Sequence, residues 1–300
     1  MRFTKAHGTG NDFVVLLDLE DRLEVPADLV RALCDRRHGV GGDGVLRLGA
    51  PPDEADVFMD YRNADGTAVE MCGNGVRVTA KHMVDHGLVP ADAEVVRVAT
   101  RAGIKPVRVE RDEAGLLVRA TVDMGPPILA PGEVPFVAEA GAAEALQHEV
   151  VVEDTPVRLS VVSMGNPHAV LEVGAVDAAP VTTLGPRLEH HPRFPQQVNV
   201  GFAQVLDDES IRLRVWERGV GETAACGTGA CAAVVALQRR GLLDDTVAVH
   251  LPGGTLTIAH PTGTLDTVTM RGPATEVARV QLDPHWLAVA GVPTHTEMPS

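Results

Sequence analysis

Two cysteines with matching neighbours are the residues of this chain best suited to chemistry. Cys72 begins the segment CGNG and Cys226 begins CGTG, so both read Cys-Gly-x-Gly. A stretch of helical length follows each one, which places each thiol at the start of a helix. Helix starts favour Ser, Thr, Asp and Asn as caps, and Cys is not among them. We therefore expect a chemical role for both thiols, since helix N-termini lower thiol pKa values.

The surroundings of the two cysteines repeat along the chain. Each Cys-Gly-x-Gly lies 15 residues before the glycine of a Gly-Leu pair and nine residues after a strand-like segment, FMDYRN or LRVWE. TGNDFVVL and MGNPHAVL place an asparagine 61 and 60 residues before the respective cysteine, and VDMGPP and TMRGPA form a further pair. Four matches in one order at nearly constant spacing predict two copies of one unit, each about 150 residues long.

Two matched thiols suit the inversion of a stereocentre. Two copies folded face to face would place the thiols on opposite sides of one small cleft, where one removes an α-proton and the other delivers a proton. Because neighbouring thiols resist a double negative charge, the expected resting state is one thiolate and one thiol. The free N–H groups of each helix start would hold a carboxylate and stabilise the carbanion.

The elements that must position these thiols are many strands and a few helices. Stretches of helical pattern lie at 27–37, 75–86 and 229–240. Strand-like runs rich in Val, Ile and Leu lie at 13–17, 45–48, 57–61, 95–99, 116–122, 157–162, 169–173, 198–205, 211–216, 247–251, 255–258 and 267–270. This mixture indicates an α+β fold with sheets packed on a few helices.

Composition narrows the classes of partner. The 300 residues carry a formal net charge of −15, from 41 acidic and 26 basic residues. We therefore expect no nucleic acid and no membrane as partner, and the chemistry of the paired thiols points to a small-molecule substrate. The N-terminal segment has no signal-peptide pattern and no apolar run is long enough to span a bilayer, so we expect a cytoplasmic protein. Four cysteines in so long a chain do not predict a disulfide framework.

Six separated motifs resemble the diaminopimelate epimerase family. They are, in order, HGTGNDF, NADGTAVEMCGNGVR, MGNPHAV, VNVGF, WERGVGET and ACGTGAC. The resemblance implies cofactor-independent interconversion of LL- and meso-diaminopimelate, a precursor of lysine and peptidoglycan, and a homodimer. It also implies an α+β fold of two pseudo-symmetric domains, each a mixed β-sheet wrapped around a central helix.

The expected domains follow from the repeat and the resemblance. The N-terminal half is expected at 1–123, joined by a strand around 273–282, and the C-terminal half at 124–272. The segment 124–135, dense in Pro and Gly, is typical of a linker. The polar tail at 283–300 is expected to be partly disordered.

The resemblance also implies roles for individual residues. Cys72 and Cys226 would be the acid–base pair, and His168 and Glu217 would modulate their pKa values. The substrate-binding residues would be Asn11, Asn63, Gly73, Asn74, Asn166, Asn199, Glu217, Arg218, Gly227 and Thr228. Among these, Arg218 suits a carboxylate by bidentate pairing and Glu217 suits an ammonium. Gly44 departs from some family members that carry a polar side chain there, so the resemblance leaves open whether its loop contacts the substrate.

Three alternative functions fit the motifs less well. A racemase of the proline or hydroxyproline type would carry His after Cys-Gly, where this chain has Asn74. A thiol–disulfide oxidoreductase would carry C-x-x-C, which is absent. A cysteine hydrolase could use His168 as its base, but the second symmetric cysteine would then have no role.

Other signals are interpreted structurally. The segment GVGGDG (39–44) matches a dinucleotide fingerprint, but a helix precedes it and a strand follows, which is the wrong order. His82 and His86 have the i, i+4 spacing of metal ligands, but the sequence places no third ligand, so we predict a solvated helix face and no metal. Cys34 and Cys231 are predicted to lie in the core.

Overall fold

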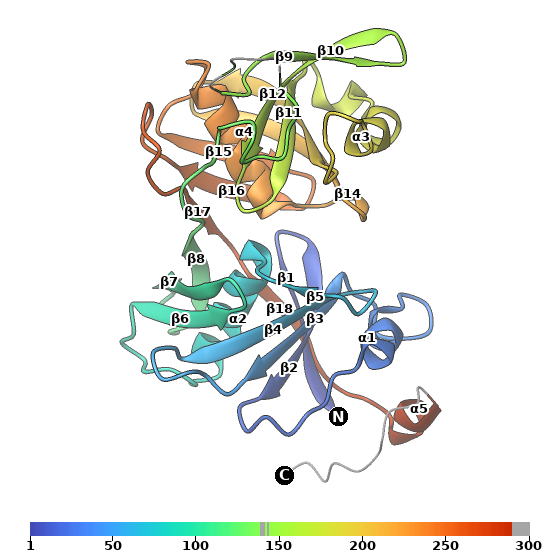
Figure 1. The fold of residues 1–300 in the computed structure, drawn as a ribbon. Helices are drawn as coiled ribbons and strands as arrows, with labels where there is room; N and C mark the ends of the chain where they lie inside the picture. The colour runs from blue at the N-terminus through green and yellow to red at the C-terminus, as the bar shows by residue number, and fades with distance from the viewer. Residues whose placement is uncertain (139–141, 143, 290–300) are drawn as a thin grey trace. The chain divides into compact units, whose positions relative to one another are not determined.

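The computed structural model describes residues 1–138, 142 and 144–289, and its contacts divide into two compact units. Unit 1 consists of Met1–Val122 and the chain from Gly272 onward, and unit 2 is Asp123–Arg271. Unit 1 is therefore built from two separate stretches of chain, whereas unit 2 is continuous (Figure 1).

Unit 1 holds its helices among curved strands. In chain order its elements are β1 (Arg2–Gly8), β2 (Asn11–Asp18), α1 (Ala27–Cys34), β3 (Gly44–Gly49), β4 (Val57–Asn63), β5 (Ala68–Val69), α2 (Gly73–Asp85), β6 (Val95–Thr100), β7 (Gly103–Arg111), β8 (Leu117–Asp123), β18 (Thr275–Gln281) and α5 (Pro284–Val289).

After its first strand, unit 2 repeats the order of β1 to β8, with a 3₁₀ turn added before its first helix. Its elements are β9 (His148–Val152), β10 (Thr155–Ser163), β11 (Pro167–Glu172), the 3₁₀ turn η1 (Val176–Ala178), α3 (Val181–Glu189), β12 (Asn199–Asp207), β13 (Ser210–Glu217), β14 (Gly221–Thr223), α4 (Gly227–Gln238), β15 (Thr246–Leu251), β16 (Gly254–Ala259) and β17 (Thr269–Gly272).

Strand pairing repeats as well. In unit 1, β2 pairs in parallel with β3, β3 pairs antiparallel with β4, and β4 pairs in parallel with β6. The same three directions recur in unit 2: β11 pairs in parallel with β12, β12 pairs antiparallel with β13, and β13 pairs in parallel with β15. Even the flanking strand is equivalent, because β18 pairs antiparallel with β1 as β9 does with β10. The predicted fold class, two similar mixed sheets, is confirmed.

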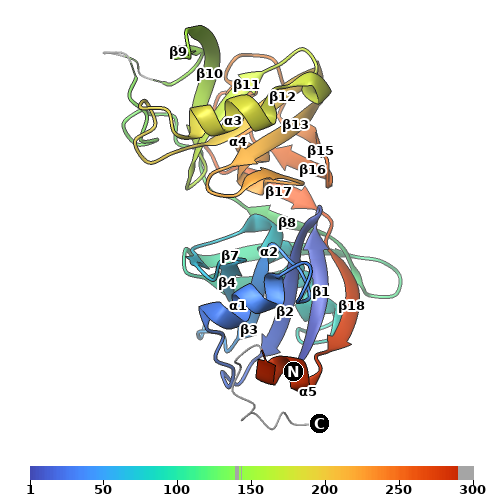
Figure 2. The same ribbon diagram turned by 90° about the vertical axis from the view of Figure 1, so that its right-hand side faces the viewer.

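Each unit wraps its sheet around one buried helix. Eleven of the 12 residues of α4 are buried, and its sequence GTGACAAVVALQ is apolar on every face. Such a helix requires cover on all sides. Eleven of the 13 residues of α2 are buried too, although its sequence is more polar. Figures 1 and 2 show these two helices inside the strands of their own units.

A second helix in each unit packs on the other face of the sheet. In β3, Val45 packs in the cluster with α1, whereas the next residue, Leu46, faces Gly75 of α2. This is the alternation of side chains expected in a strand buried on both faces. In unit 2, α3 packs against Val200 and Phe202 of β12 (Figure 2). Cys34 lies in the α1 cluster and Cys231 is fully buried in α4, which confirms both core predictions.

Some elements differ from the sequence expectations. Helix α3 was not expected, because Pro186 lies inside it and proline removes a helical hydrogen bond. The segment 124–135 begins at the boundary between the units, but Val134 within it is buried in the core of unit 2. Residues 284–289 of the expected tail form α5, where Trp286 packs against the α1 cluster and donates to the carbonyl of His38. Disorder was also expected over 290–300, which lies outside the described residues.

No helix in the described part of the chain is long and apolar enough to cross a membrane; the longest, α2, has 13 residues.

Candidate active site

Both cysteines cap the helices that follow them. Cys72 has extended backbone geometry, and its Sγ accepts a hydrogen bond from the Gly75 N–H at 3.5 Å. Cys226 has the same geometry, with the Gly229 N–H 3.3 Å from its Sγ. Each thiol therefore occupies the position that Ser or Asp usually takes, accepting from the N3 N–H. The helices begin two residues earlier than the pattern predicted.

The second glycine of each Cys-Gly-x-Gly is required by close packing around the first turn of the helix. A Cβ added to Gly229 would lie 3.2 Å from Cys226 Sγ and 3.3 Å from Val215 Cγ2. A Cβ added to Gly75 would lie 3.1 Å from Leu46 Cδ2. These glycines make room for the sulfur and the sheet beneath the first turn, in addition to any ligand.

A chain of hydrogen bonds orients the polar residues around Cys72. Arg77 donates to Asn74 Oδ1 at 2.8 Å, Asn74 donates to Asn11 Oδ1 at 3.2 Å, and Asn11 donates to Asp43 Oδ2 at 2.8 Å. The Cys72 thiol also lies 3.8 Å from Asn11 Oδ1. Unit 1 thus brings together the predicted residues Asn11, Cys72 and Asn74, and each amide has one orientation that satisfies its partners.

The sequence interpretation gave Arg77 no role, yet it supports this arrangement. Its side chain is fully buried and donates to Thr9 Oγ1 at 3.0 Å and to the carbonyls of Gly73 and Pro273 at 3.4 and 3.3 Å. No spacing in the sequence reveals this role, because Thr9 and Pro273 lie far from Arg77 along the chain.

Asn63 lies at the end of β4, beside Gly44, the glycine that replaces a polar residue of some family members. Its Oδ1 accepts from the Tyr61 hydroxyl at 2.7 Å, and its amide nitrogen lies 3.5 Å from Thr67 Oγ1. Gly44 is its cross-strand partner in β3. A Cβ on Gly44 would lie 2.4 Å from the Arg62 carbonyl and 2.6 Å from the Tyr61 ring, so no side chain fits there without a shift of the strands.

In unit 2, the predicted asparagines lie at the starts of two parallel strands. His168 in β11 is the register partner of Asn199 in β12. His168 Nε2 donates to Asn166 Oδ1 at 3.0 Å, and Asn199 donates to the Pro167 carbonyl at 3.0 Å. Asn199 Oδ1 accepts from the backbone N–H of Arg218 at 2.9 Å, which fixes the end of β13 beside these strands.

Glu217 and Arg218 are neighbours with different surroundings. Glu217 accepts from Thr223 Oγ1 and lies close enough to Cys226 to act on its thiol. Arg218 is exposed and donates from Nη1 to the Gln196 carbonyl at 2.9 Å. Among the described residues no partner is found for the Nε or Nη2 of Arg218, so two donors remain for a ligand.

The expectation that the helix start favours a thiolate is wrong for Cys226 in this state. Its side chain is 4% exposed, and burial raises the pKa of the thiol well above its usual value. The negative charge of Glu217 raises this pKa further, while hydrogen bonds with Thr228 and the Gly229 N–H lower it without compensating. Cys226 is therefore a neutral thiol in the free protein.

His168 is neutral as well. It is 1% exposed, and burial, with a contribution from the Arg218 charge, lowers its pKa to about 3. His168 therefore carries no positive charge that could act on a cysteine in the free protein.

The first turn of α4 has donors available for an anion. The Gly227 and Thr228 N–H groups are the first of the helix and have no acceptor within the described parts of the chain. The Thr228 hydroxyl lies 3.5 Å from Cys226 Sγ. A carboxylate at these N–H groups would lie beside the thiol, at the positive end of the helix dipole.

Solved structures similar to this one include racemases, epimerases, PhzF proteins and a methylitaconate isomerase. A hydroxyproline epimerase from Agrobacterium vitis, with bound trans-4-hydroxy-L-proline, superposes with a TM-score of 0.70 at 18% identity, covering 93% of this chain and 91% of that chain. A PhzF-family phenazine biosynthesis protein from Bacillus anthracis gives 0.66 at 18% identity, covering 94% and 98%. At these identities the likeness shows the fold, a mixed α+β fold that this chain shares with these structures.

Sequence comparison then identifies the family. The family model described as diaminopimelate epimerase matches residues 3–130 and 160–277. The diaminopimelate epimerase of Ectopseudomonas mendocina is 50% identical over 284 residues, covering 94% of this chain and 99% of that protein, and that of Azotobacter vinelandii is 49% identical over the same shares. This chain belongs to the diaminopimelate epimerase family, a family of isomerases, which confirms the resemblance.

Proposed function

We propose that this protein interconverts LL- and meso-2,6-diaminopimelate without a cofactor, using Cys72 and Cys226 as acid and base. The observation that carries the proposal is the matched pair of cysteine caps, one on the central helix of each repeated unit. Relatives that are 50% identical over 94% of the chain bear the name diaminopimelate epimerase, which supports this substrate.

The protonation state of Cys226 indicates how one turnover would start. Because burial and Glu217 keep the Cys226 thiol protonated, Cys226 suits the proton donor and Cys72 the base. One sulfur removes the α-proton from one face, and the other delivers its proton to the opposite face. The reverse reaction exchanges the two roles, which is why both groups are thiols.

The carbanion formed between these steps needs strong stabilisation. The N–H groups of Gly227 and Thr228 in α4, with those of Gly73 and Asn74 in α2, would hold the carboxylate on the reacting carbon. Preorganised donors of this kind act where negative charge develops and need no rearrangement during the reaction. Asn11, Asn63, Asn166 and Asn199 would bind the rest of the substrate.

The different surroundings of Glu217 and Arg218 suit the two ends of diaminopimelate. Glu217, next to Cys226, would pair with the ammonium on the reacting carbon. Arg218, with two donors remaining, would bind the carboxylate of the other amino-acid head by a bidentate pair. A substrate with a single amino-acid head would leave Arg218 unused.

Hydrogen exchange at the α-carbon tests the proposal directly. Dialysed protein is incubated in deuterium oxide with LL-diaminopimelate and no added cofactor. We expect α-deuterium uptake together with formation of the meso isomer. Proline and 4-hydroxyproline, run in parallel, should show neither. Absence of both signals with diaminopimelate, or exchange with proline instead, would refute the assignment.

Single thiol substitutions test the two-base mechanism. We expect C72A and C226A each to lose at least about 100-fold in the rate of interconversion, the scale of one general acid or base. The matched control is C231A, which removes a thiol buried in the helix that Cys226 caps. A C226A enzyme with the activity of C231A would leave the mechanism without support.

We further propose that the protein acts as a homodimer, as its family resemblance implies, and that it does so in the cytoplasm. Light scattering coupled to gel filtration should give twice the chain mass of 31.7 kDa. A mass of one chain under the conditions of the activity assay would contradict the dimer.

A further inference from the structure

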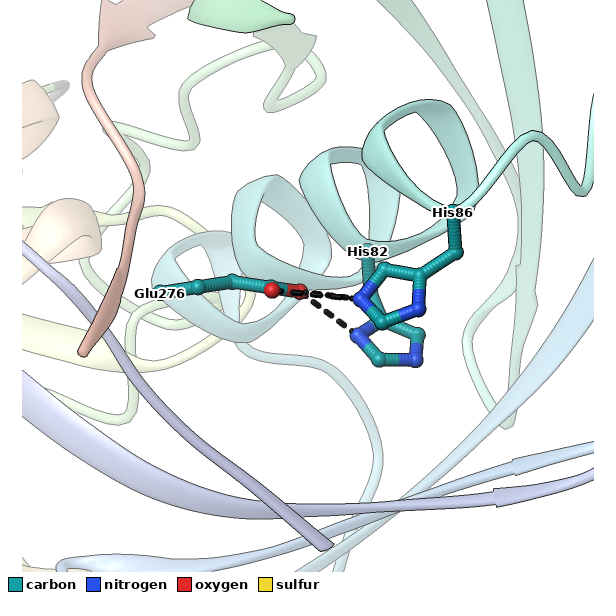
Figure 3. Close-up of side chains that lie close together, drawn as sticks. All are labelled: His82, His86 and Glu276. Carbon is teal, nitrogen blue, oxygen red and sulfur yellow. Dashed lines mark hydrogen bonds and ion pairs between the residues drawn. The ribbon is translucent and has the colours of Figure 1, made fainter. Parts of the chain in front are cut away.

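Two histidines and a glutamate form a cluster at the end of α2 opposite to Cys72. His82 lies in the last turn of the helix and His86 caps its C-terminus. Glu276 reaches them from β18, with its Oε1 2.7 Å from His82 Nδ1 and 3.1 Å from His86 Nε2 (Figure 3). The two imidazole rings lie against each other, with centroids 3.9 Å apart.

This cluster overturns the prediction of a solvated helix face. The His82 residue is only 3% exposed, and the His86 and Glu276 side chains are 21% and 13% exposed. The third group is 190 residues further along the chain than His86, and the pairing of β18 with β1 places it here. Spacing within α2 could not reveal it.

The three groups have the composition of a zinc site. Their ligand atoms, one from each residue, all lie within 4.8 Å of one another. Zinc binds imidazole nitrogen and carboxylate oxygen at about 2.0–2.2 Å, so neighbouring ligands around a tetrahedral ion are about 3.3 Å apart. The N···O distances of 2.7 and 3.1 Å are shorter than this spacing by about 0.6 and 0.2 Å, so the three side chains need to move apart only slightly to bind an ion.

The charges at the cluster also favour a cation. Glu276 supplies the carboxylate of the cluster, and its side chain is only 13% exposed. The C-terminal end of a helix dipole attracts positive charge. Arg279 is the competing cation, 3.5 Å from Glu276 Oε2, but its side chain is 65% exposed and can move aside.

We propose that His82, His86 and Glu276 bind a Zn²⁺ ion, with a fourth position open to water through the partly exposed His86 and Glu276. Nitrogen ligands disfavour Mg²⁺ and Ca²⁺, and two imidazoles with one carboxylate suit zinc. The ion would tie β18 to α2, so its role is to stabilise unit 1 and not to take part in proton transfer.

Cobalt absorption and thermal unfolding test this site on the whole protein. Chelator-treated protein titrated with Co²⁺ should develop the visible absorption of a four-coordinate ion, without the near-ultraviolet band of a thiolate–cobalt bond. Zinc at 100 times its Kd should lower the unfolding equilibrium constant of unit 1 about 100-fold, which raises its midpoint. A thiolate band, or the absence of any visible band, would overturn the proposal.

Variants assign the signal to the cluster. H86Q and E276Q should lose the cobalt spectrum and the zinc-induced rise of the unfolding midpoint. R279Q should bind both metal ions more tightly than the wild-type protein, because it removes the competing cation. The control is H38Q, which alters an exposed histidine of the same unit. If H86Q and E276Q bind Co²⁺ as tightly as H38Q does, the ion lies elsewhere and the proposal is wrong.

Discussion

Replacing Gly229 with alanine tests whether the position of the Cys226 sulfur matters. The new Cβ would lie 3.2 Å from Cys226 Sγ, 3.3 Å from Cys226 Cβ and 3.3 Å from Val215 Cγ2. Each contact is a few tenths of an ångström too short, so the sulfur has to move outward by about that amount. The N–H that the sulfur accepts from is retained, because only the side chain changes.

Stability and activity should respond differently to G229A. Alanine gains about 1 kcal/mol of helix propensity over glycine, and mild overpacking costs about 1–3 kcal/mol. The net loss in unfolding free energy is therefore about 0–2 kcal/mol. A misplacement of about 1 Å in a reacting group costs roughly 100-fold in rate, so a few tenths of an ångström should reduce kcat roughly 3- to 10-fold.

Two matched glycines provide the controls. A Cβ at Gly174 would meet nothing within 4 Å, so G174A should keep wild-type kcat. At Gly75 the nearest atoms are Leu46 Cδ2 and Met59 Sδ, at 3.1 and 3.4 Å, which are ends of flexible side chains. G75A should therefore lower kcat less than G229A does. Epimerisation kinetics and urea unfolding measure both quantities, and wild-type kcat in a folded G229A enzyme would refute the reasoning.

Two further substitutions probe buried polar side chains. R77M should lower the unfolding free energy by about 3–5 kcal/mol in urea, because it leaves the buried acceptors of Arg77 without their donor; a loss below about 1 kcal/mol would contradict this. His168 has a folded pKa of about 3, below its unfolded value of 6.5, so its stability contribution is present above pH 6.5 and is lost as the pH falls toward 3. Across this window the unfolding free energy of the wild-type protein should fall by about 1.4 kcal/mol per pH unit more than that of H168Q. Equal slopes of unfolding free energy against pH for the two proteins would disprove a buried neutral His168.

Local and repeated features were predictable from the sequence. The caps at Cys72 and Cys226 and the two central helices follow from short motifs that occur twice. Strand β1 was not expected, since its sequence RFTKAHG has few apolar residues, and it is held by pairing with β2 and β18. Helix α3 was missed for the opposite reason, because packing on β12 outweighs the effect of Pro186.

The electrostatics of the site depended on burial, which a sequence pattern does not measure. A helix start does lower the pKa of a thiol, and the Gly229 N–H acts on Cys226 in that direction. The depth of Cys226 and the carboxylate of Glu217 reverse the net effect. Likewise, Arg77 and Glu276 could be assigned only when the fold placed their partners beside them.

The two-part construction of unit 1 has a consequence for synthesis on the ribosome. Strand β1 is made early, but its partner β18 follows the whole of unit 2 in the chain. Until β18 emerges, β1 leaves one edge unpaired, and such an edge invites wrong partners. In unit 2 the equivalent edge does not wait for a distant partner, since β9 and β10 are neighbours in sequence. The half that the ribosome makes first is therefore the half that is completed last, contrary to the usual N-terminal-first order of domain folding.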